Sequence, residues 1–158
     1  MGQVTEGEEW APPLVSRPIS ESAAFEGNEE IAEARDLARI FLEDLQADHG
    51  VPVSDPAMGM VQLVVSELVT NARKFAPGPI LLTLELREGA VEVSVWDTEP
   101  RMPVVHAPDP SRVGQHGLEL VMAICPHFEV HREPVGKRVM AAVMVAADAV
   151  GDMAVRPG

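Results

Sequence analysis

Apolar residues recur every three or four positions in two stretches of the chain, which is the spacing of an amphipathic helix. The first stretch covers residues 28–50, with Asn28 as a suitable N-cap. The second has a start signal at Asp55 and Pro56 and stops before the Pro-Gly-Pro run at 77–79, because proline cannot continue a helix. Its apolar stripe consists of Val61, Val64, Val65, Leu68, Ala72 and Phe75.

Elsewhere the pattern changes to alternation of apolar and polar residues, the spacing of a strand with one buried face. This alternation predicts two hairpins and an edge strand, namely residues 80–87 with 91–96, residues 128–133 with 137–145, and a strand within 14–25. Between the hairpins, residues 97–116 contain four prolines and no periodicity. A loop of that length usually has a functional reason.

The order of these elements predicts an α/β (α+β) two-layer sandwich, with a third, short helix over 117–124. We expect a mixed, mainly antiparallel sheet with the helices on one face. The 158 residues are enough for one buried core. We therefore predict an acidic, proline-containing and partly disordered segment at 1–24, one domain at 25–146 and a flexible tail at 147–158.

Charge and composition narrow the function classes. The net charge is −13 and there is no Tyr, which disfavours contact with nucleic acid because phosphates are repelled and bases find few stacking platforms. Cys125 is the single cysteine, so no internal disulfide can form. The acidic N-terminus does not resemble a signal peptide, and no apolar run approaches the length of a membrane span. These features predict a cytoplasmic protein.

The second predicted helix carries a polar pair beside its apolar stripe. Glu67 and Asn71 are four residues apart, so both project from one side of the helix. A carboxylate next to an amide oxygen suits a hard cation such as Mg²⁺ and the phosphates that it carries. The alternative is that both side chains are simply solvated.

Two further sites carry candidate chemistry. Asp97 stands where a predicted strand ends and the long loop begins, a position that can hold a donor group of a ligand or cap a turn. Two glycines stand at or just before a predicted helix N-terminus, in residues 113–118, Val-Gly-Gln-His-Gly-Leu. Bare backbone N–H groups there form an anion site, although the glycines could also merely start the helix.

In this order, the three clusters resemble the GHKL ATPases, whose ATP-binding domain has the Bergerat fold. SELVTNARKF resembles the N box of that family, DTEPRMP its first glycine-box position, and VGQHGLELV its second glycine box. The resemblance covers roughly residues 25–145 and is greatest with the short stand-alone anti-sigma factor serine/threonine kinases. Asp97, Pro100 and Arg101 match the D-x-x-P-R pattern of these short members, whereas Glu99 stands where the wider family commonly has glycine.

The resemblance implies a role for each site residue. Asn71 would ligate Mg²⁺, Glu67 would be the catalytic base, and Lys74 would approach a phosphate. Asp97 would accept a hydrogen bond from the adenine amino group. The other implied nucleotide-binding residues are Arg101, Gly114, His116, Gly117 and Leu118, with residues 98–116 as a lid.

The implied function is that of an ATP-binding regulatory protein, a serine/threonine kinase that phosphorylates a serine of an antagonist protein and sequesters a sigma factor. ATP and Mg²⁺ are the implied cofactors, and a homodimer is implied by the same resemblance. The alternative is a nucleotide-binding partner-switching module without kinase activity. A sensor histidine kinase domain and a sandwich with an empty pocket are further alternatives.

Overall fold

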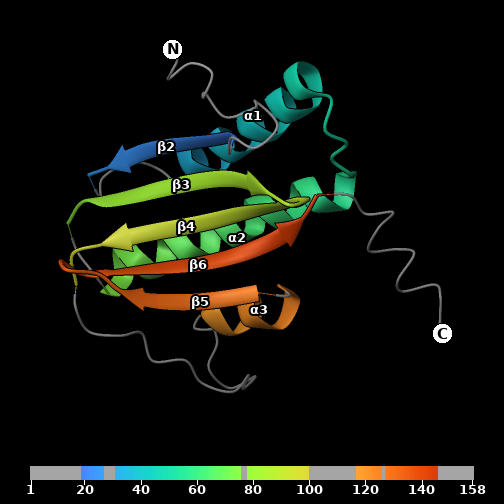
Figure 1. Cartoon of the computed structure of the whole chain (residues 1–158). Coiled ribbons are helices and arrows are strands. Elements are labelled where there is room, and N and C mark those ends of the chain that lie inside the picture. The colour runs from blue at the N-terminus through green and yellow to red at the C-terminus, as the bar shows by residue number, and fades with distance from the viewer. Residues whose placement is uncertain (1–18, 27–30, 76–77, 100–116, 126, 146–158) are drawn as a thin grey trace, which may run out of the picture.

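One antiparallel sheet and the helices that cover one of its faces make up the described structure (Figure 1). The structure is a computed structural model that describes residues 19–26, 31–75, 78–99, 117–125 and 127–145. Its strands are β2 (Ile19–Phe25), β3 (Ile80–Arg87), β4 (Ala90–Asp97), β5 (His127–Arg132) and β6 (Lys137–Met144). They lie in the order β2-β3-β4-β6-β5, and every pairing between them is antiparallel.

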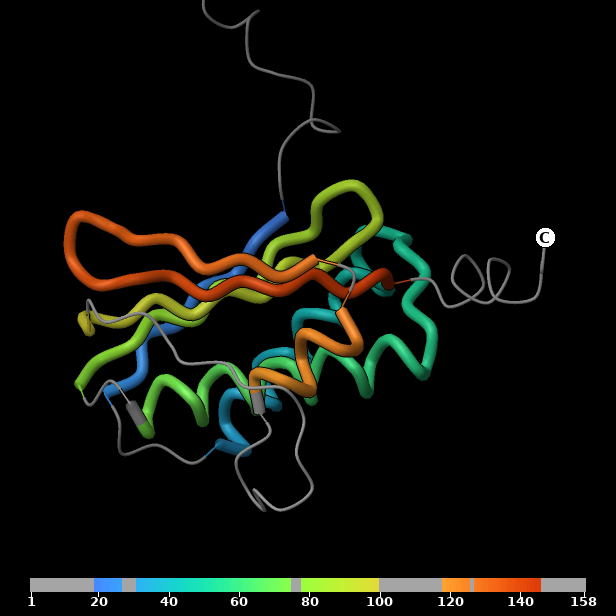
Figure 2. The backbone as a smooth tube through the Cα atoms, turned by 90° about the horizontal axis from the view of Figure 1, so that it is seen from below, coloured from blue at the N-terminus to red at the C-terminus, as the bar shows by residue number. Residues whose placement is uncertain are grey.

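The helices are α1 (Ile31–His49), α2 (Asp55–Phe75) and α3 (Gly117–Ile124). Figure 2, a view along the sheet, shows them on one side of the strands. This arrangement confirms the predicted two-layer sandwich, with a mainly antiparallel sheet covered on one face. Both hairpins, the edge strand and the short helix are also confirmed, whereas the predicted N-cap Asn28 lies outside the described residues.

The α2 helix begins at Asp55, as the sequence predicted, and the structure shows the residue that caps it. The hydroxyl of Ser54 accepts a hydrogen bond from the Ala57 backbone N–H at 3.1 Å, and its carbonyl accepts one from the Met58 N–H at 2.9 Å. Ser54 is therefore the N-cap. Asp55 and Pro56 occupy the first turn, where a missing N–H is tolerated and a carboxylate complements the helix dipole.

The core lies between α2 and the inner face of the central strands. The apolar stripe of α2 is buried from Val61 to Ala72, and Val64 and Val65 are fully inaccessible. They face Val91, Val93 and Val95 of β4, which alternate with half-buried residues as the strand period requires. Each such side chain stabilises the fold by about 1.5–3 kcal/mol through burial.

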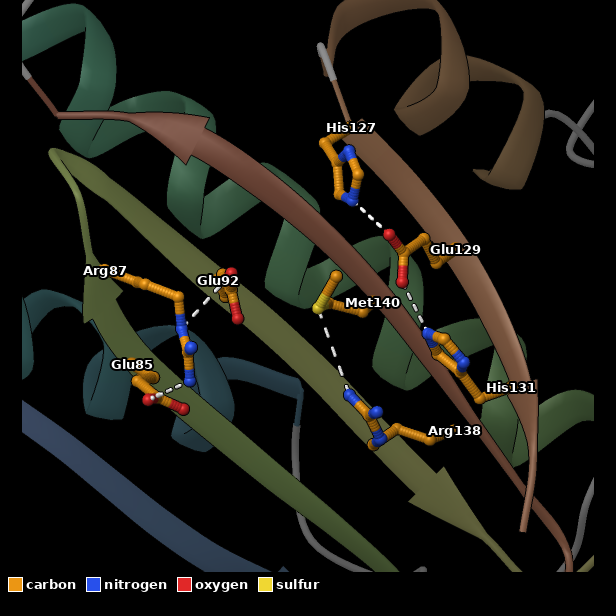
Figure 3. Close-up of polar contacts among 8 residues, drawn as sticks. All are labelled: Glu85, Arg87, Glu92, His127, Glu129, His131, Arg138 and Met140. Carbon is orange, nitrogen blue, oxygen red and sulfur yellow. Dashed lines mark hydrogen bonds and ion pairs between the residues drawn. The ribbon is translucent and has the colours of Figure 1, made fainter. Parts of the chain in front are cut away.

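The opposite face of the sheet carries polar side chains (Figure 3). Arg87 forms ion pairs with Glu85 and Glu92, and Glu129 lies between His127 and His131 on β5. Hydrogen bonds from His131 and His127 lower the pKa of the Glu129 carboxyl. These contacts are at the surface, so screening by water keeps each of them weak.

Gly136, in the turn between β5 and β6, packs directly on the end of β4. Its φ is +80°, and a Cβ added there would lie 1.8 Å from the carbonyl oxygen of Asp97. We predict that Gly136→Ala destabilises the protein by at least about 2 kcal/mol, because strain at positive φ adds to overpacking. Urea unfolding measures this change.

Gly59 is the matched control for that substitution. It lies inside α2, where an added Cβ meets nothing within 4 Å. Gly59→Ala should stabilise the protein by about 0.5–1 kcal/mol, because alanine loses less backbone entropy in a helix. Equal unfolding midpoints for the two variants would contradict the packing of Gly136 against Asp97.

Cys125 is buried, and burial raises the pKa of its thiol to about 11. At pH 8 only a very small fraction of a thiol with that pKa is in the reactive thiolate form. We predict that iodoacetamide alkylates the native protein on the order of 100-fold more slowly than the urea-unfolded protein. Mass spectrometry of timed samples measures both rates, and equal rates would show that the thiol is accessible.

Candidate functional site

Glu67 and Asn71 share one flank of α2. Successive helical residues are about 100° apart, so these two lie on one side of the buried stripe while Gln62 and Ser66 lie on the other. The flank with Gln62 and Ser66 faces α1. The Arg35 guanidinium donates a hydrogen bond to the Ser66 hydroxyl at 3.3 Å, and the Gln62 amide donates one to the Arg35 carbonyl at 3.5 Å. The Glu67 and Asn71 flank therefore faces away from α1.

Both side chains are half-buried on that flank, and neither has a hydrogen bond or ion pair to another described residue. α3 also packs against α2 (Figures 1 and 2). A half-buried carboxylate and amide without a described partner retain their capacity to accept hydrogen bonds or ligate a cation. This is the arrangement that the i, i+4 spacing predicted.

The C-terminal turn of α2 lies at the same end of the sheet as Asp97. α2 ends at Phe75 and β3 begins at Ile80. Five residue steps span at most about 17 Å, so the end of α2 lies no farther than that from the start of β3. Ile80 in turn pairs directly with Asp97. Asn71 and the exposed Lys74, both near the end of α2, are thus brought to the edge where β4 ends.

Asp97 is the most deeply buried charged residue of the described chain, at 1% exposure. Its Oδ1 accepts hydrogen bonds from the Glu99 backbone N–H at 2.9 Å and from Lys137 Nζ at 3.1 Å. The bond to Glu99 closes an Asx turn, so the turn-capping interpretation of Asp97 holds. Oδ2 has no hydrogen bond within the described part of the chain.

Lys137 is the residue that the sequence interpretation missed. It is 3% exposed, lies opposite Asp97 across the β4 and β6 pairing, and donates a second hydrogen bond to the Glu99 carbonyl at 3.2 Å. The signal was present in the sequence: Lys137 is in phase with the apolar residues Val139 and Val143 and so belongs to the inner face.

The remaining predicted residues are placed only in part. Arg101, Gly114 and His116 lie outside the described residues, as does most of the predicted lid at 98–116. Gly117 begins α3, and the side chain of Leu118 is buried in the core at 4% exposure. Leu118 can thus offer a ligand only its backbone.

The donor set on α2 fits Mg²⁺ carried by a phosphate. No cluster of three His, Cys, Asp or Glu side chains that could hold a metal is found among the described residues. Mg²⁺ needs no such cluster, because it usually keeps one or two protein oxygens and takes the rest from phosphates and water. The Asn71 amide and the Glu67 carboxylate provide oxygens of that kind.

A comparison with protein families matches residues 29–143 to the family described as "Histidine kinase-like ATPase domain". The match covers most of the chain and includes α2, Asp97 and the start of α3. The chain belongs to this family. The predicted kinship is thereby confirmed, and no curated protein matches the chain.

The fold of this chain recurs in a solved structure. The chain is similar to the crystal structure of the RsbU and RsbW domains of Rv1364c from Mycobacterium tuberculosis, with a TM-score of 0.56 and 16% identity over 78% of this chain. The chain covers 32% of that protein. A weaker similarity is to the histidine kinase domain of the blue-light activated histidine kinase from Erythrobacter litoralis EL346, with a TM-score of 0.40, 22% identity, and coverage of 56% and 45%.

The buried pair of this histidine kinase-like ATPase domain lies at the end of the sheet, beside the first turn after β4. Asp97 and Lys137 lie between the ends of β4 and β6 and the Asx turn at Glu99, so the core and the turn shield both charges.

As for the helices, none within the ranges that the structure describes is both long enough and apolar enough to cross a membrane.

The buried pair gives a stability prediction. Asp97→Ala would leave the Lys137 ammonium buried without its carboxylate, which we expect to destabilise the protein by about 3–5 kcal/mol. Arg87→Ala removes two ion pairs of the exposed face and should leave the unfolding midpoint nearly unchanged. Urea unfolding of both variants tests the contrast, and a small effect of Asp97→Ala would show that the pair is solvated.

Proposed function

We propose that this protein is an ATP-binding regulatory protein of the anti-sigma factor kinase type, which transfers a phosphoryl group to a serine of an antagonist protein. One observation supports it most: the half-buried Glu67 and Asn71 flank of α2 and the buried carboxylate of Asp97 lie at the same end of the sheet in a histidine kinase-like ATPase domain. This arrangement supports a site that would combine an acceptor for a base with oxygens for a metal-bound phosphate.

Each residue has a separate task in this proposal. Oδ2 of Asp97 would accept a hydrogen bond from the adenine amino group, and the Asn71 amide oxygen would ligate Mg²⁺. When bound, Mg²⁺ neutralises charge on the phosphates. Lys74 adds a positive charge at the end of α2, and Glu67 orients the serine hydroxyl and takes its proton.

The segments around α3 complete the proposed nucleotide site. Backbone N–H groups from Gly114 to Leu118 would hold phosphate oxygens at the start of the helix. Arg101 and His116 would contribute from the predicted lid. The partners in this proposal are an antagonist protein and a sigma factor, the protein acts in the cytoplasm, and it acts as a homodimer.

The partner-switching module without kinase activity shares the same pocket and differs only in chemistry. Asn71 and Asp97 serve both functions, because both functions need bound nucleotide. Glu67 distinguishes them, since a module that only binds nucleotide has no use for a base. The experiment on Glu67 therefore separates the two proposals.

We predict that Glu67→Ala lowers phosphoryl transfer by about 10²- to 10⁴-fold while the Kd for Mg·ATP changes less than threefold, roughly. Transfer is measured with ATP labelled on its γ-phosphate and a serine-bearing antagonist protein, and binding is measured by calorimetry. Ser66→Ala is the matched control, because Ser66 is the adjacent residue on the flank that faces α1. Equal transfer by Glu67→Ala and the parent protein would remove Glu67 from the chemistry.

We predict the opposite division for Asn71→Ala, which should weaken binding of ATP only when Mg²⁺ is present. Loss of one ligand to a charged group corresponds to roughly 10- to 100-fold in Kd. Calorimetry with and without Mg²⁺ measures this, with the exposed neighbour Thr70→Ala as control. Binding by Asn71→Ala that equals the parent in Mg²⁺ would assign the metal to another residue.

A further inference from the structure

Lys137 has a place in the fold that ordinary surface lysines do not have. Its side chain is 3% exposed. The residue is the first of β6 and lies directly opposite Asp97, the last residue of β4. Lys137, Asp97 and Glu119 are the buried charged residues of the described chain. Lysine is almost never fully buried unless it is paired.

The contacts of Lys137 join two different parts of the site. Nζ donates to Oδ1 of Asp97 at 3.1 Å and to the carbonyl oxygen of Glu99 at 3.2 Å. Glu99 in turn donates its N–H to the same Oδ1 at 2.9 Å. Lysine, carboxylate and the first turn after β4 therefore form one closed set of hydrogen bonds.

The two carboxylate oxygens of Asp97 differ in their hydrogen bonds. Oδ1 accepts two protein hydrogen bonds, whereas Oδ2 accepts none within the described residues. Two donors on one oxygen, one of them an ammonium at 3.1 Å, fix the rotation of the carboxylate about its Cβ–Cγ bond. A carboxylate oxygen with no protein donor can accept one hydrogen bond from a ligand, so Oδ2 favours a ligand with an N–H donor.

We propose that Lys137 is a positioning residue for base recognition, which holds Asp97 so that Oδ2 selects a purine with an exocyclic amino group. The inference rests on the proposed function, since it assumes that the site binds a nucleotide. Lys137 acts through Asp97 and the Glu99 turn and does not itself contact the base. Its removal should therefore alter discrimination between bases more than affinity for the rest of the nucleotide.

The experiment compares Mg·ATP with the Mg²⁺ complex of purine riboside triphosphate, which has hydrogen in place of the 6-amino group. Calorimetry on the full chain should show that the parent binds ATP about 10- to 100-fold more tightly, the equivalent of one hydrogen bond to a charged group. In Lys137→Met, ATP binding should weaken until the affinities for ATP and for the analogue differ by no more than about threefold. Binding of the analogue should change little.

Arg138→Met is the matched control. Arg138 follows Lys137 on β6, points to the other face of the sheet and pairs with Glu133, so the variant removes one positive charge without touching Asp97. Its ratio should equal that of the parent. An unchanged ratio in Lys137→Met, or a parent ratio near one, would overturn the role of Lys137 while leaving nucleotide binding intact.

A measurement on the unsubstituted chain keeps the inference testable if Lys137→Met does not fold. NMR of the lysine Nζ groups should show a protected Lys137 ammonium that persists when ATP binds, while the Asp97 carboxyl carbon shifts with ATP and not with the analogue. Loss of the Lys137 signal on ATP binding would overturn the inference. Failure of the parent to bind either nucleotide would instead overturn the proposed function, and the inference with it.

Discussion

The rotation of α2 about its own axis is the constraint on which the site depends. Four apolar residues per two turns must face β4 and β6, and their burial fixes the helix to within a fraction of a turn. Once Val64 and Leu68 are buried, Glu67 and Asn71 can only lie on the flank beside them. The same packing that stabilises the fold thus aims the two polar groups, and no separate interaction is needed to orient them.

The second constraint is the meeting of β4 and β6 at the end of the sheet. Antiparallel pairing places the last residue of β4 opposite the first residue of β6, so Asp97 and Lys137 are neighbours by register alone. Gly136 then permits the turn to close on the Asp97 backbone, where any larger residue would collide. A buried ion pair of this kind adds little net stability compared with apolar side chains, but it fixes the orientation of its members.

Sequence periodicity was sufficient for the elements and for the α2 flank, because both depend on contacts within a few residues. It predicted α3 and both hairpins, and it placed Glu67 beside the buried stripe of α2, where the fold has it. It did not predict Lys137 as a partner of Asp97, since 40 residues separate the two and the order of strands in the sheet is not a local property. It also placed the α2 start correctly at Asp55, and the structure adds Ser54 as the N-cap.

The charge around the site decides whether a chain of net charge −13 can hold a polyphosphate. Residues 1–50 carry 12 acidic and 3 basic residues, so most of the negative charge lies outside α2 and the strands that follow it. Exposed charges more than about 8–10 Å away are largely screened at physiological salt. Near the site, Arg73 and Lys74 lie in the last turn of α2, and the Asp97 charge is balanced by Lys137. The local charge is therefore compatible with an anion even though the whole chain is acidic, and bound Mg²⁺ would lower the remaining repulsion by neutralising the phosphates themselves.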